Sequence, residues 1–87
     1  MKKLRLFYAS WCPHCKNAKT WMAELKKEDP RYESIDIEEI DYEKNPEKMK
    51  GLQFELVPTY YLGDKKIFEG APKKEIIKEI FDKTLES

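Results

Sequence analysis

The sequence predicts an α/β fold in which a four-stranded mixed sheet is flanked by helices. Segments with the alternating apolar pattern of strands and segments with helical periodicity follow one another along the chain, in the order βαβ-α-ββα. The length of 87 residues suits one domain, spanning 1–87, and no repeat or linker divides it. Hydrophobic residues make up 40% of the chain, which is enough for a core although 39% of the residues are charged.

The first strand is expected over residues 3–8, K-L-R-L-F-Y, where apolar and charged side chains alternate before an aromatic end. A helix should follow at once, because Pro13 suits the first helical position and makes Cys12 the N-cap. Asp29 and Pro30 end this helix. The side chains that recur at helical spacing and should face the sheet are Cys15, Ala18, Met22 and Leu25.

The middle of the chain is less regular. A second strand is expected from Tyr32 to Ile37. It could extend to Asp41, but the acid-rich sequence there does not define where the strand ends. Asn45 and Pro46 suit the N-cap and first residue of a short helix that Gly51 stops. This part of the sequence therefore predicts one strand and one short helix.

The last third of the chain predicts a hairpin and a helix. Residues 57–62, V-P-T-Y-Y-L, form a strand, and G-D-K-K-I-F-E pairs back against it through a turn at Gly63 and Asp64. Residues 70–72, G-A-P, then open the final helix. Its apolar stripe, which should lie across the sheet, consists of Ile76, Ile77, Ile80, Phe81, Thr84 and Leu85.

The charge balance gives the chain no general attraction to polyanions. The formal net charge is +0, so neither nucleic acid nor an anionic membrane surface is an expected partner. The sequence has no membrane-length apolar segment and no signal-peptide core. Two cysteines separated by two residues cannot staple distant elements, and such usage fits a reactive pair better than a structural disulfide. We therefore expect a monomer in the cytoplasm.

The stretch S-W-C-P-H-C-K holds both cysteines and the only histidine. A thiol at a helix N-cap faces unpaired backbone N–H groups, here expected from His14 and Cys15, together with the positive end of the helix dipole. Both favour the thiolate, so Cys12 is the candidate nucleophile. Cys15, one turn later and facing inward, is the candidate resolving thiol, which would close a Cys12–Cys15 disulfide and release the product.

The two residues between the cysteines, Pro13 and His14, are expected to tune this pair. An imidazolium at His14 would stabilise the Cys12 thiolate and so make the oxidised ring a stronger oxidant. A cytoplasmic location would favour reduction instead. The direction of the reaction therefore stays open from the sequence.

Three motifs carry a resemblance to a known family: W-C-P-H-C after a hydrophobic strand, V-P-T about forty residues later, and F-E-G-A before the last helix. Together they resemble the thioredoxin and glutaredoxin superfamily over nearly the whole chain. The resemblance implies a minimal thioredoxin fold with a cis bond between Val57 and Pro58. It also implies an apolar substrate groove around Cys12 formed by Trp11, Val57, Pro58, Gly70 and Ala71.

The resemblance implies a thiol-disulfide oxidoreductase that needs no metal and no bound cofactor beyond its own redox-active disulfide. Its substrates would be disulfide-containing proteins or small molecules, and its electrons would come from an upstream reductase or from glutathione. The length resembles glutaredoxin, whereas Trp11 and the dipeptide Asn45-Pro46 resemble thioredoxin. Thioredoxins have a buried aspartate in this first strand and a lysine near it, where this chain has Leu6 and Glu39.

Several other functions remain open. A glutathione-coupled glutaredoxin, a disulfide isomerase and a disulfide oxidant all use the same dithiol chemistry. A metal or iron-sulfur module would also use two cysteines at this spacing. Cys12, Cys15 and His14 supply three ligands at most, so a closed zinc site would need carboxylates or a second subunit. A non-catalytic interaction domain with the same fold is the third alternative.

Overall fold

The computed structural model describes residues 1–87 and contains a four-stranded sheet in the order β2-β1-β3-β4. Its central strand β1 runs parallel to β2 and antiparallel to β3, and β3 and β4 form an antiparallel hairpin. This arrangement confirms the predicted mixed sheet and the predicted hairpin. The strands are β1 Leu4–Tyr8, β2 Ile37–Asp41, β3 Thr59–Leu62 and β4 Lys65–Glu69.

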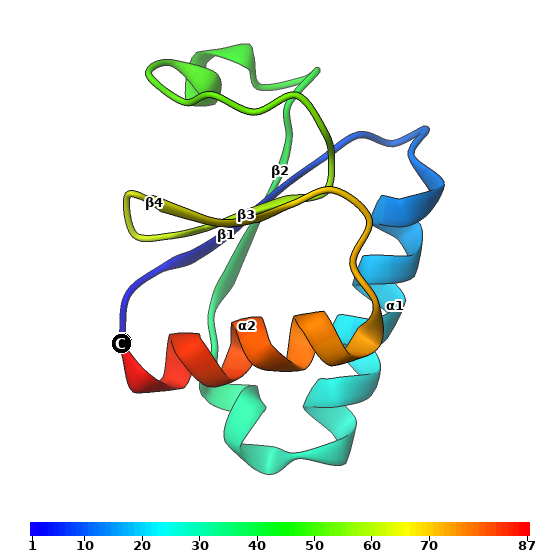
Figure 1. The fold of residues 1–87 in the computed structure, drawn as a ribbon, viewed down its shortest axis with the longest axis vertical. Helices are drawn as coiled ribbons and strands as arrows, with labels where there is room; N and C mark the ends of the chain where they lie inside the picture. The colour runs from blue at the N-terminus through cyan, green and yellow to red at the C-terminus, as the bar shows by residue number, and fades with distance from the viewer.

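Both long helices, α1 (Pro13–Glu28) and α2 (Lys74–Glu86), cover the same face of the sheet, as Figure 1 shows. The inward face of α1 is the predicted one, because Ala18 and Met22 pack in the main core against Leu4 and Leu6 of β1. The buried residues of α2 are Ile77, Ile80, Phe81 and Thr84, four of the six predicted for its apolar stripe. Neither helix is long and apolar enough to cross a membrane.

The opposite face of the sheet is covered by the segment between β2 and β3, which includes the one-turn helix η2 (Pro46–Met49) and lies above the sheet in Figure 1. Phe7, Ile40 and Tyr61 form the sheet side of this second core, and the ring of Phe54 lies 5.4 Å from that of Phe7. β1 is therefore buried on both faces, which holds its carboxyl end, and the start of α1 beyond it, in a fixed place.

The expected strand from Tyr32 is wrong. Residues Pro30–Ser34 form a short 3-10 helix, η1, and the strand begins only at Ile37. Tyr32 turns into the core instead, where its ring meets Phe81 at 5.2 Å and its hydroxyl donates to Asp82 at 2.6 Å. These contacts come from a helix 50 residues away, so no local pattern could indicate them.

Two further expectations differ in extent. The short helix after Asn45 is a 3-10 turn ending at Met49, and Asn45 makes no side-chain capping bond. The last helix starts at Lys74 with Lys73 as N-cap, not at residues 70–72. Gly70 has φ = 120°, a backbone conformation that favours glycine and cannot open a helix.

Candidate active site

Cys12 is the N-cap of α1, as predicted. Its backbone is extended, with φ = −82° and ψ = 115°, and Pro13 is the first helical residue. The N–H of Cys15 donates to the Cys12 sulfur, Sγ, at 3.3 Å, whereas the expected second donor, the His14 N–H, makes no such bond. One backbone donor and the helix dipole therefore act on this sulfur.

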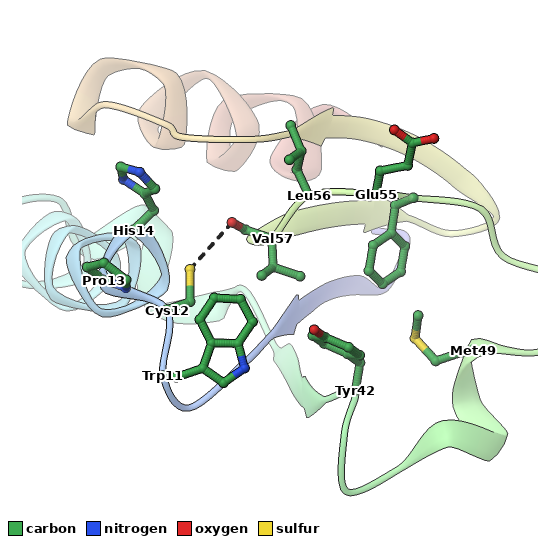
Figure 2. A pocket seen from close by; sticks show the side chains of 10 residues that line it. Trp11, Cys12, Pro13, His14, Tyr42, Met49, Glu55, Leu56 and Val57 are labelled. Carbon is green, nitrogen blue, oxygen red and sulfur yellow. Dashed lines mark hydrogen bonds between the residues drawn. The ribbon is translucent and has the colours of Figure 1, made fainter.

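Opposite Cys12 lies the segment that leads into β3. The Cys12 thiol donates to the carbonyl oxygen of Val57 at 3.5 Å, the dashed line in Figure 2. The bond between Val57 and Pro58 is cis, which confirms the expectation from the V-P-T motif. The chain thus brings together two motifs that are 45 residues apart in sequence.

Cys15 lies beneath Cys12 and is more deeply enclosed. Both cysteines are free thiols, and the exposed fraction is 3% for Cys12 and 1% for Cys15. Burial raises the pKa of Cys15 to about 12, and the hydrogen bond and charge of Cys12 act in the same direction. A backbone hydrogen bond from Ala9 and the positive charge of Lys19 oppose this effect. The Cys15 thiol therefore keeps its proton at neutral pH.

A mostly apolar pocket of about 460 Å³ opens beside Cys12. Figure 2 shows it running from His14 past Cys12 and Val57 to Tyr42 and Met49. The ten lining residues are Trp11, Cys12, Pro13, His14, Tyr42, Met49, Phe54, Glu55, Leu56 and Val57. It is large enough to receive side chains of a partner molecule next to the Cys12 sulfur.

Trp11 and Leu56 are the exposed apolar side chains at this pocket. Their exposed fractions are 62% and 58%. The indole N–H of Trp11 donates to Glu43 at 3.0 Å, so the ring is held from the turn after β2. That turn is itself fixed by Asp41, whose carboxylate accepts from the N–H of Glu43 at 3.0 Å. Exposed apolar surface around a reactive group is typical of a docking site.

The structure brings some of the predicted groove residues together and leaves others apart. Trp11 and Val57 line the pocket beside Cys12, with Pro13 and His14 at its helix end. Three other predicted residues, Pro58, Gly70 and Ala71, do not line it. Pro58 is buried behind the pocket and its carbonyl accepts from the Gly70 N–H at 3.1 Å, whereas Ala71 is exposed. Their part in substrate binding stays a prediction.

One wall of the pocket was not foreseen. Tyr42, Met49, Phe54, Glu55 and Leu56 come from the irregular segment between β2 and β3. The spacing of Leu52, Phe54 and Leu56 in L-Q-F-E-L was the available signal, since it resembles a half-buried extended stretch. Leu52 and Phe54 do pack against the sheet, whereas Leu56 stays exposed.

Comparison with known proteins decides the family. The protein-family model described as thioredoxin matches residues 2–83. A thioredoxin of Methanocaldococcus jannaschii is 35% identical over 83 residues, which is 95% of each chain. The chain belongs to the thioredoxin family. It is a thiol-disulfide oxidoreductase, and Cys12 and Cys15 are the pair of its C-x-x-C active site.

Solved thioredoxin structures share the fold. The reduced desulfothioredoxin of Desulfovibrio vulgaris Hildenborough is 29% identical, with a TM-score of 0.68, covering 94% of this chain and 80% of that one. The Malassezia sympodialis thioredoxin is 16% identical, with a TM-score of 0.74, covering 94% and 73%. Mitochondrial thioredoxin 3 of Saccharomyces cerevisiae is 22% identical, with a TM-score of 0.72, covering 94% and 77%. At these lower identities the likeness concerns the fold alone.

Proposed function

We propose that this member of the thioredoxin family reduces disulfide bonds of protein substrates in the cytoplasm, with Cys12 as nucleophile and Cys15 as resolving thiol. The observation that carries the proposal is the unequal setting of the two sulfurs. Cys12 sits at the helix N-cap, accepts the Cys15 N–H and lines the apolar pocket. Cys15 is buried beneath it with a raised pKa. This inequality supports a fixed order of attack.

The reaction proceeds by two exchanges. The Cys12 thiolate attacks one sulfur of the substrate disulfide, and the other substrate sulfur leaves as a thiolate that takes up a proton. Cys15 then loses its proton and attacks the Cys12 sulfur of the mixed disulfide. The second substrate sulfur leaves, and a Cys12–Cys15 disulfide remains. Two electrons pass to the substrate, and an upstream dithiol reductase or glutathione returns them. No metal and no bound cofactor takes part.

The pocket favours protein substrates with apolar side chains next to their disulfide. Trp11 and Leu56 offer exposed apolar surface on either side of Cys12, and Phe54 extends it inward. We propose that Val57, two residues before β3, pairs through its backbone with an extended substrate segment. Pro58, Gly70 and Ala71 would then support this strand-like docking from behind.

Pro13 and His14 are proposed to set the redox potential. His14 is exposed at the first turn of α1 and lines the pocket, so a positive charge there would act on the Cys12 thiolate. A midpoint potential near ~−270 mV would support the reductase, whereas ~−180 to −120 mV would support an oxidant, isomerase or glutathione-coupled shuttle. Equilibration in defined dithiol buffers measures this potential.

Trapping tests the order of attack. Cys15→Ser cannot resolve the mixed disulfide, so it should form a stable adduct with a disulfide-bonded peptide that mass spectrometry detects on Cys12. The matched control, Cys12→Ser, should form none. The reverse pattern would show that Cys15 attacks first and would refute the assignment. Stoichiometric zinc or iron in the purified protein would instead favour the metal module.

A further inference from the structure

The resolving thiol must lose a proton, and β1, whose titratable side chains are Arg5 and Tyr8, carries no carboxylate or imidazole to accept it. Leu6, at the centre of β1, is 0% exposed within the main core. Cys15 does not line the substrate pocket. Its proton therefore needs another route and its thiolate another source of stabilisation.

A second pocket reaches Cys15 from the other side. It has a volume of about 300 Å³ and is lined by Tyr8, Ala9, Ser10, Cys15, Lys16 and Lys19. None of these residues lines the substrate pocket. The two thiols thus line two different pockets.

Lys19 is held in position at this second pocket. It lies one helical turn after Cys15, on the same face of α1. Its ammonium nitrogen, Nζ, is 3.3 Å from the centroid of the Tyr8 ring and 3.2 Å from a carboxylate oxygen of Glu39. Glu39 belongs to β2 and pairs in register with Leu6 of β1. Three elements therefore fix one cation beside the resolving thiol.

The other titratable groups around Cys15 do not supply this charge. Cys12 raises the pKa of Cys15. Tyr60 of β3 and Tyr42 are phenols whose own pKa values are raised, first by burial and in part by the charge of Cys15. Lys16 lines the same pocket but is exposed. Lys19 is the charged side chain that lowers the pKa of Cys15.

We propose that Lys19 is a positioning residue that stabilises the Cys15 thiolate in the resolving step, while the thiol proton leaves to solvent through the second pocket. The inference rests on the proposed roles of Cys12 and Cys15. In the mixed disulfide Cys12 carries neither a thiol proton nor a charge, so its opposition to Cys15 ionisation disappears. Burial remains, and the fixed ammonium of Lys19 offsets part of its cost. Cys15 then attacks the Cys12 sulfur, and the departing substrate thiolate takes up a proton from water.

Rapid mixing of the reduced protein with the neutral probe 4,4′-dithiodipyridine separates the two steps. Attack by Cys12 releases one thiopyridone, and resolution by Cys15 releases the second, so the two absorbance phases report the two thiols. In Lys19→Gln the second phase should become slower at pH 7 and its pH midpoint should rise. For each unit by which the pKa of Cys15 rises, the thiolate fraction at pH 7 falls tenfold. The more basic thiolate is about threefold more nucleophilic, so the second phase should slow by about threefold per unit.

Two variants separate this effect from others. Lys19→Arg keeps the charge and should retain most of the wild-type second phase. Lys27→Gln removes an exposed lysine of the same helix and should change neither phase. An unchanged first phase in Lys19→Gln shows that the fold is intact.

Three outcomes would go against the inference. A second phase in Lys19→Gln with wild-type rate and midpoint would overturn it, as would equal slowing in Lys27→Gln. Release of only one thiopyridone by the wild-type protein would overturn the proposed role of Cys15, and this inference with it.

Discussion

Replacing Cys15 by alanine should make the stability of the reduced protein less sensitive to alkaline pH. Cys15 is 1% exposed, and burial raises its pKa from an ordinary value of 9.0 to about 12. The folded protein therefore keeps this proton over a pH range in which the unfolded chain releases it. Unfolding in that range is accompanied by loss of one proton, so the stability that the neutral thiol contributes must fall as the pH rises.

The size of the effect follows from the two pKa values. The contribution is fully present below the unfolded value of 9.0 and is lost progressively as the pH rises toward about 12. Release of one proton on unfolding lowers the free energy of unfolding by at most about 1.4 kcal/mol for each unit of pH increase. Between pH 8 and pH 10, integration gives a loss of about 1.4 kcal/mol in the free energy of unfolding, because titration of the unfolded thiol is half complete near pH 9. Cys15→Ala should lack this loss.

Guanidinium unfolding of both proteins, in excess reductant and followed by Trp11 and Trp21 fluorescence, measures the difference. The alanine variant will have its own constant loss of packing, so the decisive quantity is how the difference between the two proteins changes with pH. All lysines and tyrosines titrate in both proteins and largely cancel. A difference that stays constant from pH 8 to pH 10 would refute the reasoning, because Cys15 would then ionise equally in the folded and unfolded states.

Two further predictions concern the surroundings of the site. The hydroxyl of Tyr32 donates to the carboxylate of Asp82, which is 38% exposed. Tyr32→Phe removes this hydrogen bond to a charged acceptor, and because solvent screens the carboxylate the free energy of unfolding should fall by only about 1 kcal/mol at pH 7. That bond lowers the pKa of Asp82, so the contribution vanishes as the carboxylate is protonated below its ordinary value of 3.8. An equal loss at pH 7 and pH 2.5 in urea unfolding would contradict this. Glu69→Gln should raise the KM for a disulfide peptide without slowing resolution, because the Glu69 carboxylate accepts the N–H groups of Glu55 and Leu56 in the pocket wall. Steady-state and rapid-mixing kinetics test this, and an unchanged KM would count against it.

The start of α1 could be predicted from sequence because its determinants are local. Pro13 fixes the first helical turn, and the preceding residue must then be the N-cap, so Cys12 and Cys15 fall one turn apart. The cis bond at Pro58 needed the resemblance, because most bonds before proline are trans. Local chemistry and one family motif were thus enough to join the two halves of the site.

The parts that could not be predicted depend on distant contacts. The start of β2 moved because Tyr32 finds Phe81 and Asp82 on α2, and no pattern near Tyr32 records that. The far wall of the substrate pocket comes from a segment whose only regular structure is the 3-10 turn Pro46–Met49. Two long-range contacts place its side chains: Phe54 packs on Phe7, and the carboxylate of Glu69 accepts the backbone N–H of Leu56. Sequence periodicity does not record either contact.

The ion pair of Lys19 and Glu39 lies at the partly exposed rim of the sheet, whereas Leu6 fills its buried centre. A leucine at the centre of β1 gains about 1.5–3 kcal/mol from burial, whereas an isolated carboxylate there would lose several. Lys19 and Glu39 keep partial contact with solvent, with side chains 34% and 43% exposed, so their ionisation costs little. A cation in this position does not exchange a proton with the resolving thiol and acts on it only through its electrostatic field. In the proposed resolving step the second pocket gives the Cys15 proton a route to solvent, so the proton transfer does not depend on a buried base.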